Sequence, residues 1–111
     1  MQYALMIYGQ KAHADRSDEE REAFQREYLA INEFPGIFGG AQLRPVEVST
    51  TVQVDDGRTI LTDGPFIEAK EYLGGFYLLE AEDLDAATAI AARIPAARIG
   101  GAVEVRPLVE R

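Results

Sequence analysis

Two short segments of this chain are apolar at consecutive positions, and they restrict the fold more than any other feature. Residues 3–8 read YALMIY and residues 76–79 read FYLL. A strand with one wet face alternates between apolar and polar residues, whereas a strand covered on both faces is continuously apolar. We therefore expect both segments to be strands of a sheet that other parts of the assembly cover on both sides.

Two helices are predicted between the strands. Ser17, with Glu20 three residues later, forms a capping-box pattern, and an apolar stripe continues to about Glu33. Asp83 is a second cap, followed by a helix predicted over residues 84–94. The apolar positions are Phe24, Tyr28 and Ile31 in the first helix and Ala87, Ile90, Ala91 and Ile94 in the second.

The remaining β signals are a hairpin and two strands. Asp56-Gly57 accepts the positive φ angles of a type I′ turn between β-forming residues, which would set Asp55 opposite Arg58. Strands are also predicted over residues 37–45, although glycines weaken this one, and over residues 102–110. In the last strand the pattern places Val103, Val105 and Val109 on one face and Glu104 and Arg106 on the other.

The order of these elements predicts the fold class. Apart from the hairpin, the order is strand, helix, strand, strand, helix, strand, which is the split βαβ arrangement of a ferredoxin-like α+β fold. Right-handed crossovers put both helices on one face of the antiparallel sheet. We expect one domain over residues 1–111, with the hairpin as an insertion.

The other face of that sheet would be apolar and uncovered. Four strands about 20 Å long make a face of nearly 400 Å² in projection, which a soluble monomer rarely leaves exposed. We therefore expect a homodimer packed through the helix-free sheet face. The hairpin either covers this face itself or reaches across to the partner.

Composition excludes several kinds of partner and chemistry. The chain has 19 acidic and 11 basic residues, which argues against nucleic acid as a partner. It has no cysteine and one histidine, His13, so we expect neither a thiolate or multi-histidine metal site nor a cofactor. His13 lies in a polar loop and would act as an acid or base only if that loop covered a pocket. The apolar run at residues 3–8 is too short for a membrane span or signal peptide, so we expect a cytoplasmic protein with no membrane partner.

Four motifs in a fixed order make part of the chain recognisable. They are Asp63 to Phe66 (DGPF), the segment with Glu68, Lys70 and Glu71, the Gly-Gly-aromatic run Gly74 to Phe76, and Glu104 to Pro107 (EVRP). Over about residues 50–108 the chain resembles the DGPF branch of the YCII-related domain family, and the opening MQYALMIYG also fits. The resemblance implies a ferredoxin-like subunit that dimerises into an α/β barrel. It implies no generally assigned reaction, although some relatives are associated with extracytoplasmic-function sigma factors.

One pair of residues proposed for the other branch of that family has no counterpart here. There, a histidine on the first helix and the aspartate of an Asp-Pro after the second helix are proposed as an acid–base pair. Tyr28 stands near the expected histidine position, and Ile94 precedes Pro95. That pair therefore cannot be transferred to this chain.

Five residues are candidates for a site, and each also has a structural interpretation. Asp63 and Glu68 are candidate catalytic acids or bases, but Asp63 can equally brace the Gly-Pro turn. Lys70 and Arg106 are candidate ligand-binding cations, which can instead form exposed ion pairs, Lys70 with Glu68 and Arg106 with Glu104 or Glu71. Tyr77 is a candidate ligand contact or a core residue.

The DGPF corner, Lys70 and Arg106 belong to segments that are expected near one another in the sheet, and that convergence favours a site. Gly74 and Gly75 would let a ligand approach the backbone, or would relieve crowding where a strand begins.

Two functional classes remain open. The first is a homodimer with an inter-sheet or helix–sheet cavity for a small polar or anionic molecule, including cofactor-free acid–base chemistry of isomerase or lyase type. The second is a non-catalytic regulatory or interaction module, for example one associated with a sigma factor. The sequence leaves open whether the protein is an enzyme.

Overall fold

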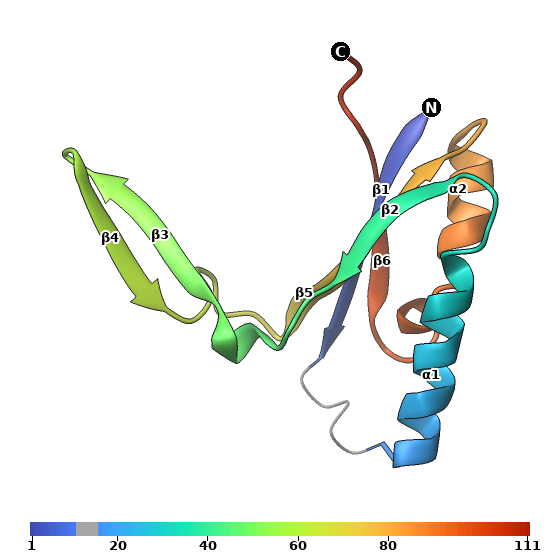
Figure 1. Cartoon of the computed structure of the whole chain (residues 1–111), viewed down its shortest axis with the longest axis horizontal. Helices are drawn as coiled ribbons and strands as arrows, with labels where there is room; N and C mark the ends of the chain where they lie inside the picture. The colour runs from blue at the N-terminus through green and yellow to red at the C-terminus, as the bar shows by residue number, and fades with distance from the viewer. Residues whose placement is uncertain (11–15) are drawn as a thin grey trace.

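The computed structural model describes residues 1–10 and 16–111, and its elements follow the predicted order (Figure 1). The interpretation of His13 lies outside the described residues. The elements are β1 (Gln2–Gln10), α1 (Asp18–Ile31), β2 (Ile37–Gln42), the 3₁₀ turn η2 (Val46–Val48), β3 (Thr50–Asp55), β4 (Arg58–Asp63), β5 (Glu71–Glu80), α2 (Leu84–Ala91), the 3₁₀ turn η3 (Pro95–Ala97) and β6 (Ala102–Pro107).

The main sheet has four antiparallel strands in the order β2-β5-β1-β6. This order confirms the ferredoxin-like α+β fold, in which each helix connects two strands that have a third strand between them. Here β5 lies between β1 and β2, and β1 lies between β5 and β6. The two continuously apolar segments lie in β1 and β5, the inner strands of the sheet. In this register Leu5 pairs with both Tyr77 and Val105.

The core lies between this sheet and the two helices, which cover the same face of it (Figure 1). Alternation along β1 and β5 turns every second side chain toward the helices. Small residues in α2 bring that helix close to the sheet. The buried apolar residues are Tyr3, Leu5, Ile31, Tyr77, Leu79, Ala87, Ala91, Ile94 and Ala96.

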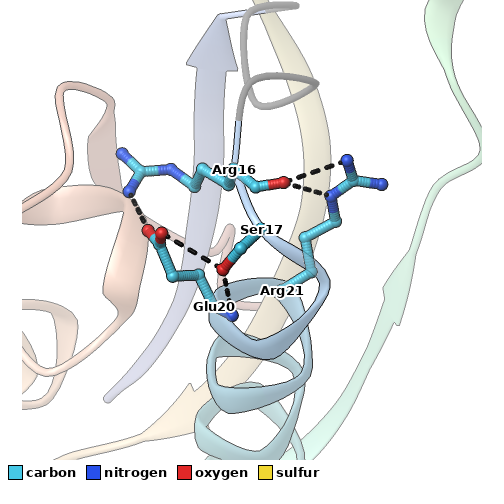
Figure 2. A network of polar contacts seen from close by, with 4 residues as sticks. All are labelled: Arg16, Ser17, Glu20 and Arg21. Atoms are coloured by element: carbon cyan, nitrogen blue, oxygen red, sulfur yellow. Dashed lines mark hydrogen bonds and ion pairs between the residues drawn. The ribbon is translucent and has the colours of Figure 1, made fainter.

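The start of α1 is fixed by the predicted cap. The Ser17 hydroxyl oxygen accepts a hydrogen bond of 3.2 Å from the Glu20 amide, and the same hydroxyl contacts the Glu20 carboxylate (Figure 2). Arg16 forms an ion pair of 3.3 Å with Glu20. Arg21 donates from its guanidinium to the Arg16 carbonyl oxygen at 3.1 and 3.2 Å, so its side chain is held at this end of the helix.

Both helices end earlier than the pattern predicts. α1 stops at Ile31, and α2 stops at Ala91 rather than at Ile94. A residue that precedes proline is disfavoured in the helical region, and Ile94 has φ −72° and ψ 128°. Pro95 therefore excludes Ile94 from α2, and the chain continues as η3.

Two strands are also shorter than predicted. β2 ends at Gln42, after which the Leu43 amide still donates to the Gly74 carbonyl oxygen at 2.9 Å and the chain then turns away from the sheet. β6 ends at Pro107, so Val109 lies beyond the strand and is exposed. Glu104 and Arg106 lie on the opposite face of β6 from Val103 and Val105, as predicted, and the pairing of β6 with β1 makes this the helix-free face.

The hairpin forms as predicted, but as a separate two-stranded sheet. Asp56 and Gly57 have φ angles of 48° and 76°, which is the type I′ turn, and Asp55 pairs with Arg58. β3 and β4 project from the side of the main sheet opposite to the helices, and they diverge from it (Figure 1). The hairpin therefore does not fold back over the helix-free face of its own subunit.

That face remains apolar along the two inner strands. Side chains that alternate with the core positions point away from the helices: Ala4, Met6 and Tyr8 from β1 and Phe76 and Leu78 from β5. Within residues 1–10 and 16–111, no helix is long and apolar enough to cross a membrane.

Candidate functional site

A groove of about 900 Å³ lies between α1 and the β2–β5 side of the sheet. We call it the α1 groove. Its size falls within the range of small-molecule sites, about 300–1,000 Å³. Among the described residues, its side-chain lining includes Arg21, Gln25, Tyr28, Leu29, Asn32, Gln42, Leu43, Arg44, Glu47, Tyr72 and Tyr77.

Glycines form part of the sheet surface that lines this groove. Gly40 and Gly75 occupy helix-facing positions in β2 and β5, where they leave the backbone uncovered. A Cβ atom on Gly40 would lie 2.5 Å from the Phe76 carbonyl oxygen, and one on Gly75 would lie 2.8 Å from the Ala41 carbonyl oxygen. Both distances are shorter than real Cβ contacts, so the close pairing of β2 with β5 requires glycine at both positions. Relief of crowding therefore explains Gly75, and both glycines leave bare backbone in the groove lining.

The groove has a charge balance unlike that of the rest of the chain. Two arginines and one glutamate are among its described lining residues, while acidic residues outnumber basic ones 19 to 11 overall. Arg21 enters from the start of α1, where the Arg16 carbonyl orients it (Figure 2). Arg44 enters from the segment after β2 and is exposed. Two cations at one concave surface make an anion the favoured guest.

Polar and apolar contacts connect the two walls. The Gln25 side-chain amide donates to the Gln42 side-chain oxygen at 3.4 Å, which links α1 to β2. Leu29 and Leu43 are both exposed and line the groove from opposite sides. The groove therefore offers apolar surface between its polar groups, which is the usual composition of a small-molecule site.

Tyr77 lines the groove but uses its hydroxyl structurally. The hydroxyl donates a hydrogen bond of 2.6 Å to the Tyr28 carbonyl oxygen. Burial is the larger cause, and the nearby Tyr28 side chain the smaller one, that together raise the pKa of Tyr77 to about 12. Burial also raises the pKa of Tyr28, against the effects of the Ala96 backbone and Arg98. Both phenols therefore stay protonated near neutral pH.

The structure brings none of the other predicted site residues into the α1 groove. Asp63 ends β4, and Glu68 and Lys70 lie in the exposed segment between β4 and β5. Arg106 lies on the helix-free face of β6, where its guanidinium donates to Glu104 at 2.7 Å. The ion pair with Glu104 was one of the two interpretations open for Arg106.

The expected convergence of these segments within one subunit is wrong. Ala4 pairs with both Arg106 and Leu78, and Leu78 lies eight positions after Lys70 along β5. At about 3.4 Å per residue, Lys70 and Arg106 are roughly 25 Å apart along the sheet. The strand register thus separates them. Their binding roles, and the catalytic roles of Asp63 and Glu68, remain predictions.

Sequence reasoning missed Arg21, Gln25, Gln42, Arg44 and Tyr72, although α1 carried a signal. Arg21, Gln25, Tyr28 or Leu29, and Asn32 recur at intervals of three and four residues. This stripe lies beside the core stripe, so it marks the helix face at the edge of the sheet contact. No comparable period identifies Arg44, which enters the groove through the turn after β2.

Comparison with known proteins identifies the family of this chain. The model of the YCII-related domain matches residues 1–111. The chain belongs to the YCII-related domain family. It is also 34% identical over 117 residues to the protein named "Uncharacterized protein R00369" of Rhizobium meliloti (strain 1021), which covers 97% of this chain and 92% of that protein.

In this YCII-related domain, the positions corresponding to the other branch's proposed acid–base pair both belong to the hydrophobic core or pack against it. Tyr28 reaches the backbone of Ala96, and Ile94 is fully buried. An aliphatic side chain such as that of Ile94 can neither accept nor donate a proton, so this pair cannot operate here. Among the described residues there is also no cluster of three His, Asp or Glu side chains that could hold a metal ion.

Proposed function

We propose that the protein is a homodimer that binds a small anionic molecule with an apolar body in the α1 groove. The observation that carries the proposal is the placement of Arg21 and Arg44 in one groove of a chain whose net charge is -8. A carboxylate fits a planar guanidinium, because both of its oxygens accept parallel hydrogen bonds.

The walls support an apolar body for this molecule. Leu29 and Leu43 are exposed in the free subunit, so a guest that covers them gains free energy from burial. Gly40 and Gly75 are also in the lining, so part of the groove floor is backbone without side chains. Small aromatic or branched carboxylic acids combine these features.

Binding without turnover is favoured over isomerase or lyase chemistry. Proton transfer near neutral pH needs a group whose pKa lies close to 7. Burial holds the pKa of Tyr77 at about 12 and raises that of Tyr28. Asp63 and Glu68 lie outside the groove, and Glu47 is the one carboxylate among its described lining residues, where two carboxylic groups would be needed to act as separate acid and base. A regulatory module that responds to a bound acid would use the same groove, and association with a sigma factor is the form of it that the DGPF resemblance suggests.

The surface of the subunit supports the homodimer. A compact monomer of 12.2 kDa exposes about 6,100 Å², whereas this subunit exposes 7979 Å². The difference, about 1,900 Å², exceeds the roughly 800 Å² that each partner contributes to a standard interface. The apolar helix-free face is one part of this surplus, and stacking two such faces would bury Met6, Phe76 and Leu78 in both subunits.

The ligand proposal is tested by thermal unfolding with a panel of small carboxylic acids, both aliphatic and aromatic. A ligand that binds only the native state, present at 100 times its dissociation constant, stabilises it by about 2.7 kcal/mol, which raises the melting temperature by several degrees. Arg44→Gln should reduce the affinity at least tenfold and leave the unliganded melting temperature within about 1 °C, because Arg44 is exposed.

Arg58→Gln is the matched control. Arg58 is an exposed arginine at the hairpin turn, outside the groove, so the same loss of charge there should leave binding unchanged. Equal loss of affinity in both variants would mean that the net charge of the chain, rather than a contact with Arg44, controls binding. A panel in which no carboxylate shifts the wild-type melting temperature would contradict the ligand proposal.

A further inference from the structure

The hairpin is an arm with one apolar side. We define the arm as β3, its turn and β4, residues 50–63. Residues directly opposite one another in an antiparallel pair share a side. Val52 pairs with Leu61 and Val54 pairs with Thr59, so Val52, Val54 and Leu61 lie on one side. Leu61 and Val54 are 67% and 69% exposed. The other side carries Gln53, Thr62 and a single large apolar residue, Ile60.

Such an arm needs a surface to pack against. A two-stranded hairpin alone is marginally stable in water, and it becomes stable when a third element covers its apolar side. Within the described residues, β3 and β4 pack mainly against each other. The radius of gyration is 15.9 Å, against about 13 Å for a compact chain of this length, which reflects how far the arm extends. The subunit itself therefore does not supply the missing surface.

The DGPF motif holds the base of this arm. The Gly64 amide donates to the Ser49 carbonyl oxygen at 2.7 Å, and the Thr51 hydroxyl donates to the Gly64 carbonyl oxygen at 2.7 Å. Two bonds on one residue close the base immediately beyond the last ladder pair, Thr50 with Asp63. The corner thus fixes the arm by its backbone, and no hydrogen bond among the described residues uses the Asp63 carboxylate. A fixed arm is suited to docking on a defined surface.

A second copy of this chain fits the position of the arm. The arm leaves the sheet on its helix-free side, which is the side where a partner sheet would stack (Figure 1). Stacked sheets lie about 10 Å apart, and a six-residue strand spans about 20 Å, so the arm is long enough to reach past the partner's sheet. The helix-free face has only about 400 Å² in projection. The arm would add the area that a standard interface of about 800 Å² per partner requires.

We propose that the arm of each subunit packs its apolar side, Val52, Val54 and Leu61, against the edge of the partner's sheet in the homodimer. The inference rests on the homodimer of the proposed function and assigns the DGPF corner to assembly. Two-fold symmetry makes the contact reciprocal, so each dimer contains it twice. An anionic membrane surface is a poor alternative occupant, because Asp55 and Asp56 lie at the tip of the arm in a chain with net charge -8.

Sedimentation equilibrium of the full-length chain tests the inference with two adjacent substitutions. Leu61→Ser removes apolar area from the proposed contact side, and Ile60→Ser removes a similar area from the opposite side. Both residues are exposed in the free subunit, 67% and 44%, so circular dichroism should show an intact fold in each. We expect Leu61→Ser to raise the dimer dissociation constant at least tenfold and Ile60→Ser to change it less than twofold.

The outcomes separate the arm from the dimer itself. A wild-type chain that is monomeric at micromolar concentration overturns both the homodimer and the arm contact. A wild-type dimer that Leu61→Ser leaves unchanged overturns the arm contact alone and keeps the sheet-to-sheet dimer. Equal weakening by both substitutions overturns the assignment of the contact to one side. We also expect the amides of residues 50–63 to exchange faster when the wild type is diluted below its dimer dissociation constant.

Discussion

The Tyr77 hydroxyl donates a hydrogen bond of 2.6 Å to the backbone carbonyl oxygen of Tyr28. In a regular helix the Asn32 amide would donate to this carbonyl oxygen, but here it donates to the Leu29 carbonyl oxygen at 3.2 Å. The Tyr28 carbonyl is therefore one of the unpaired acceptors at the end of α1, and β5 supplies its donor. This bond sets the distance between α1 and the sheet on one side of the α1 groove.

Tyr77→Phe should lower the free energy of unfolding by about 1–2 kcal/mol, because it leaves the Tyr28 carbonyl without its donor. Urea denaturation at one fixed protein concentration measures the change. Tyr3→Phe is the control, since the Tyr3 hydroxyl contacts the Met1 sulfur at 3.7 Å, which is a weak acceptor. A similar loss in both variants would mean that ring packing, rather than the hydrogen bond, controls stability here.

Stability should fall between about pH 10 and pH 12. An unfolded tyrosine has a pKa near 10, whereas that of Tyr77 in the folded chain is about 12. The folded state thus holds a proton that the unfolded state releases. The contribution of Tyr77 to the free energy of unfolding is therefore complete below pH 10 and is lost as the pH rises through 12. Absorbance titration should show at least one of the five tyrosines ionising late. Tyr77→Phe should reduce that late phase, to which Tyr28 also contributes because burial raises its pKa as well. A single transition near pH 10 in the wild type would contradict the assignment.

Two neighbouring glycines should differ sharply in their tolerance of alanine. Gly75→Ala would place a Cβ atom 2.8 Å from the Ala41 carbonyl oxygen, so we expect a loss of about 1–3 kcal/mol in unfolding free energy. Gly74→Ala has its nearest contact at 3.9 Å, from the Ile7 carbonyl oxygen, and should change stability by less than about 0.5 kcal/mol. Thermal and urea unfolding measure both. The reverse order would show that β2 does not pair with β5 in this register.

The base of the arm should loosen when its side-chain bond is removed. Thr51→Val deletes the hydroxyl that donates to the Gly64 carbonyl oxygen, and a hydrogen bond of this kind contributes about 1 kcal/mol. Amide exchange in β3 and β4 should therefore accelerate roughly fivefold. Thr62→Val, at the position paired with Thr51 on the same side of the arm, removes an exposed hydroxyl and should leave exchange unchanged. Unchanged exchange in Thr51→Val would show that the backbone bond to Ser49 is sufficient.

The local elements were predictable because each depends on residues close together in the chain. Ser17 and Asp83 cap the helices by bonding amides three residues away, and Asp56-Gly57 fixes its turn through its own dihedral angles. The order of these elements was enough for the ferredoxin-like fold, because crossover handedness leaves few arrangements. The end of α2 was missed by three residues, although Pro95 marks it in the sequence.

The candidate site could be predicted only in part. Tyr77, predicted either to contact a ligand or to lie in the core, is a core residue that also lines the groove, and its contact with a ligand remains a prediction. Lys70 and Arg106 were expected to converge and lie far apart. Which strand ends meet depends on register, and register is set by the packing of side chains that are distant in sequence. The same holds for Arg44, which shares the groove lining with Arg21 only because β2 pairs at the edge of the sheet beside β5.

The sequence by itself therefore determined the elements, their order and the presence of an uncovered apolar face, because hydrophobic period and turn chemistry act over a few residues. Only the tertiary structure decided where the cations gather and that the hairpin extends away from its own subunit. Those features depend on strand register and on a junction held by Gly64, Ser49 and Thr51, whose bonds join residues 13 and 15 positions apart in the chain.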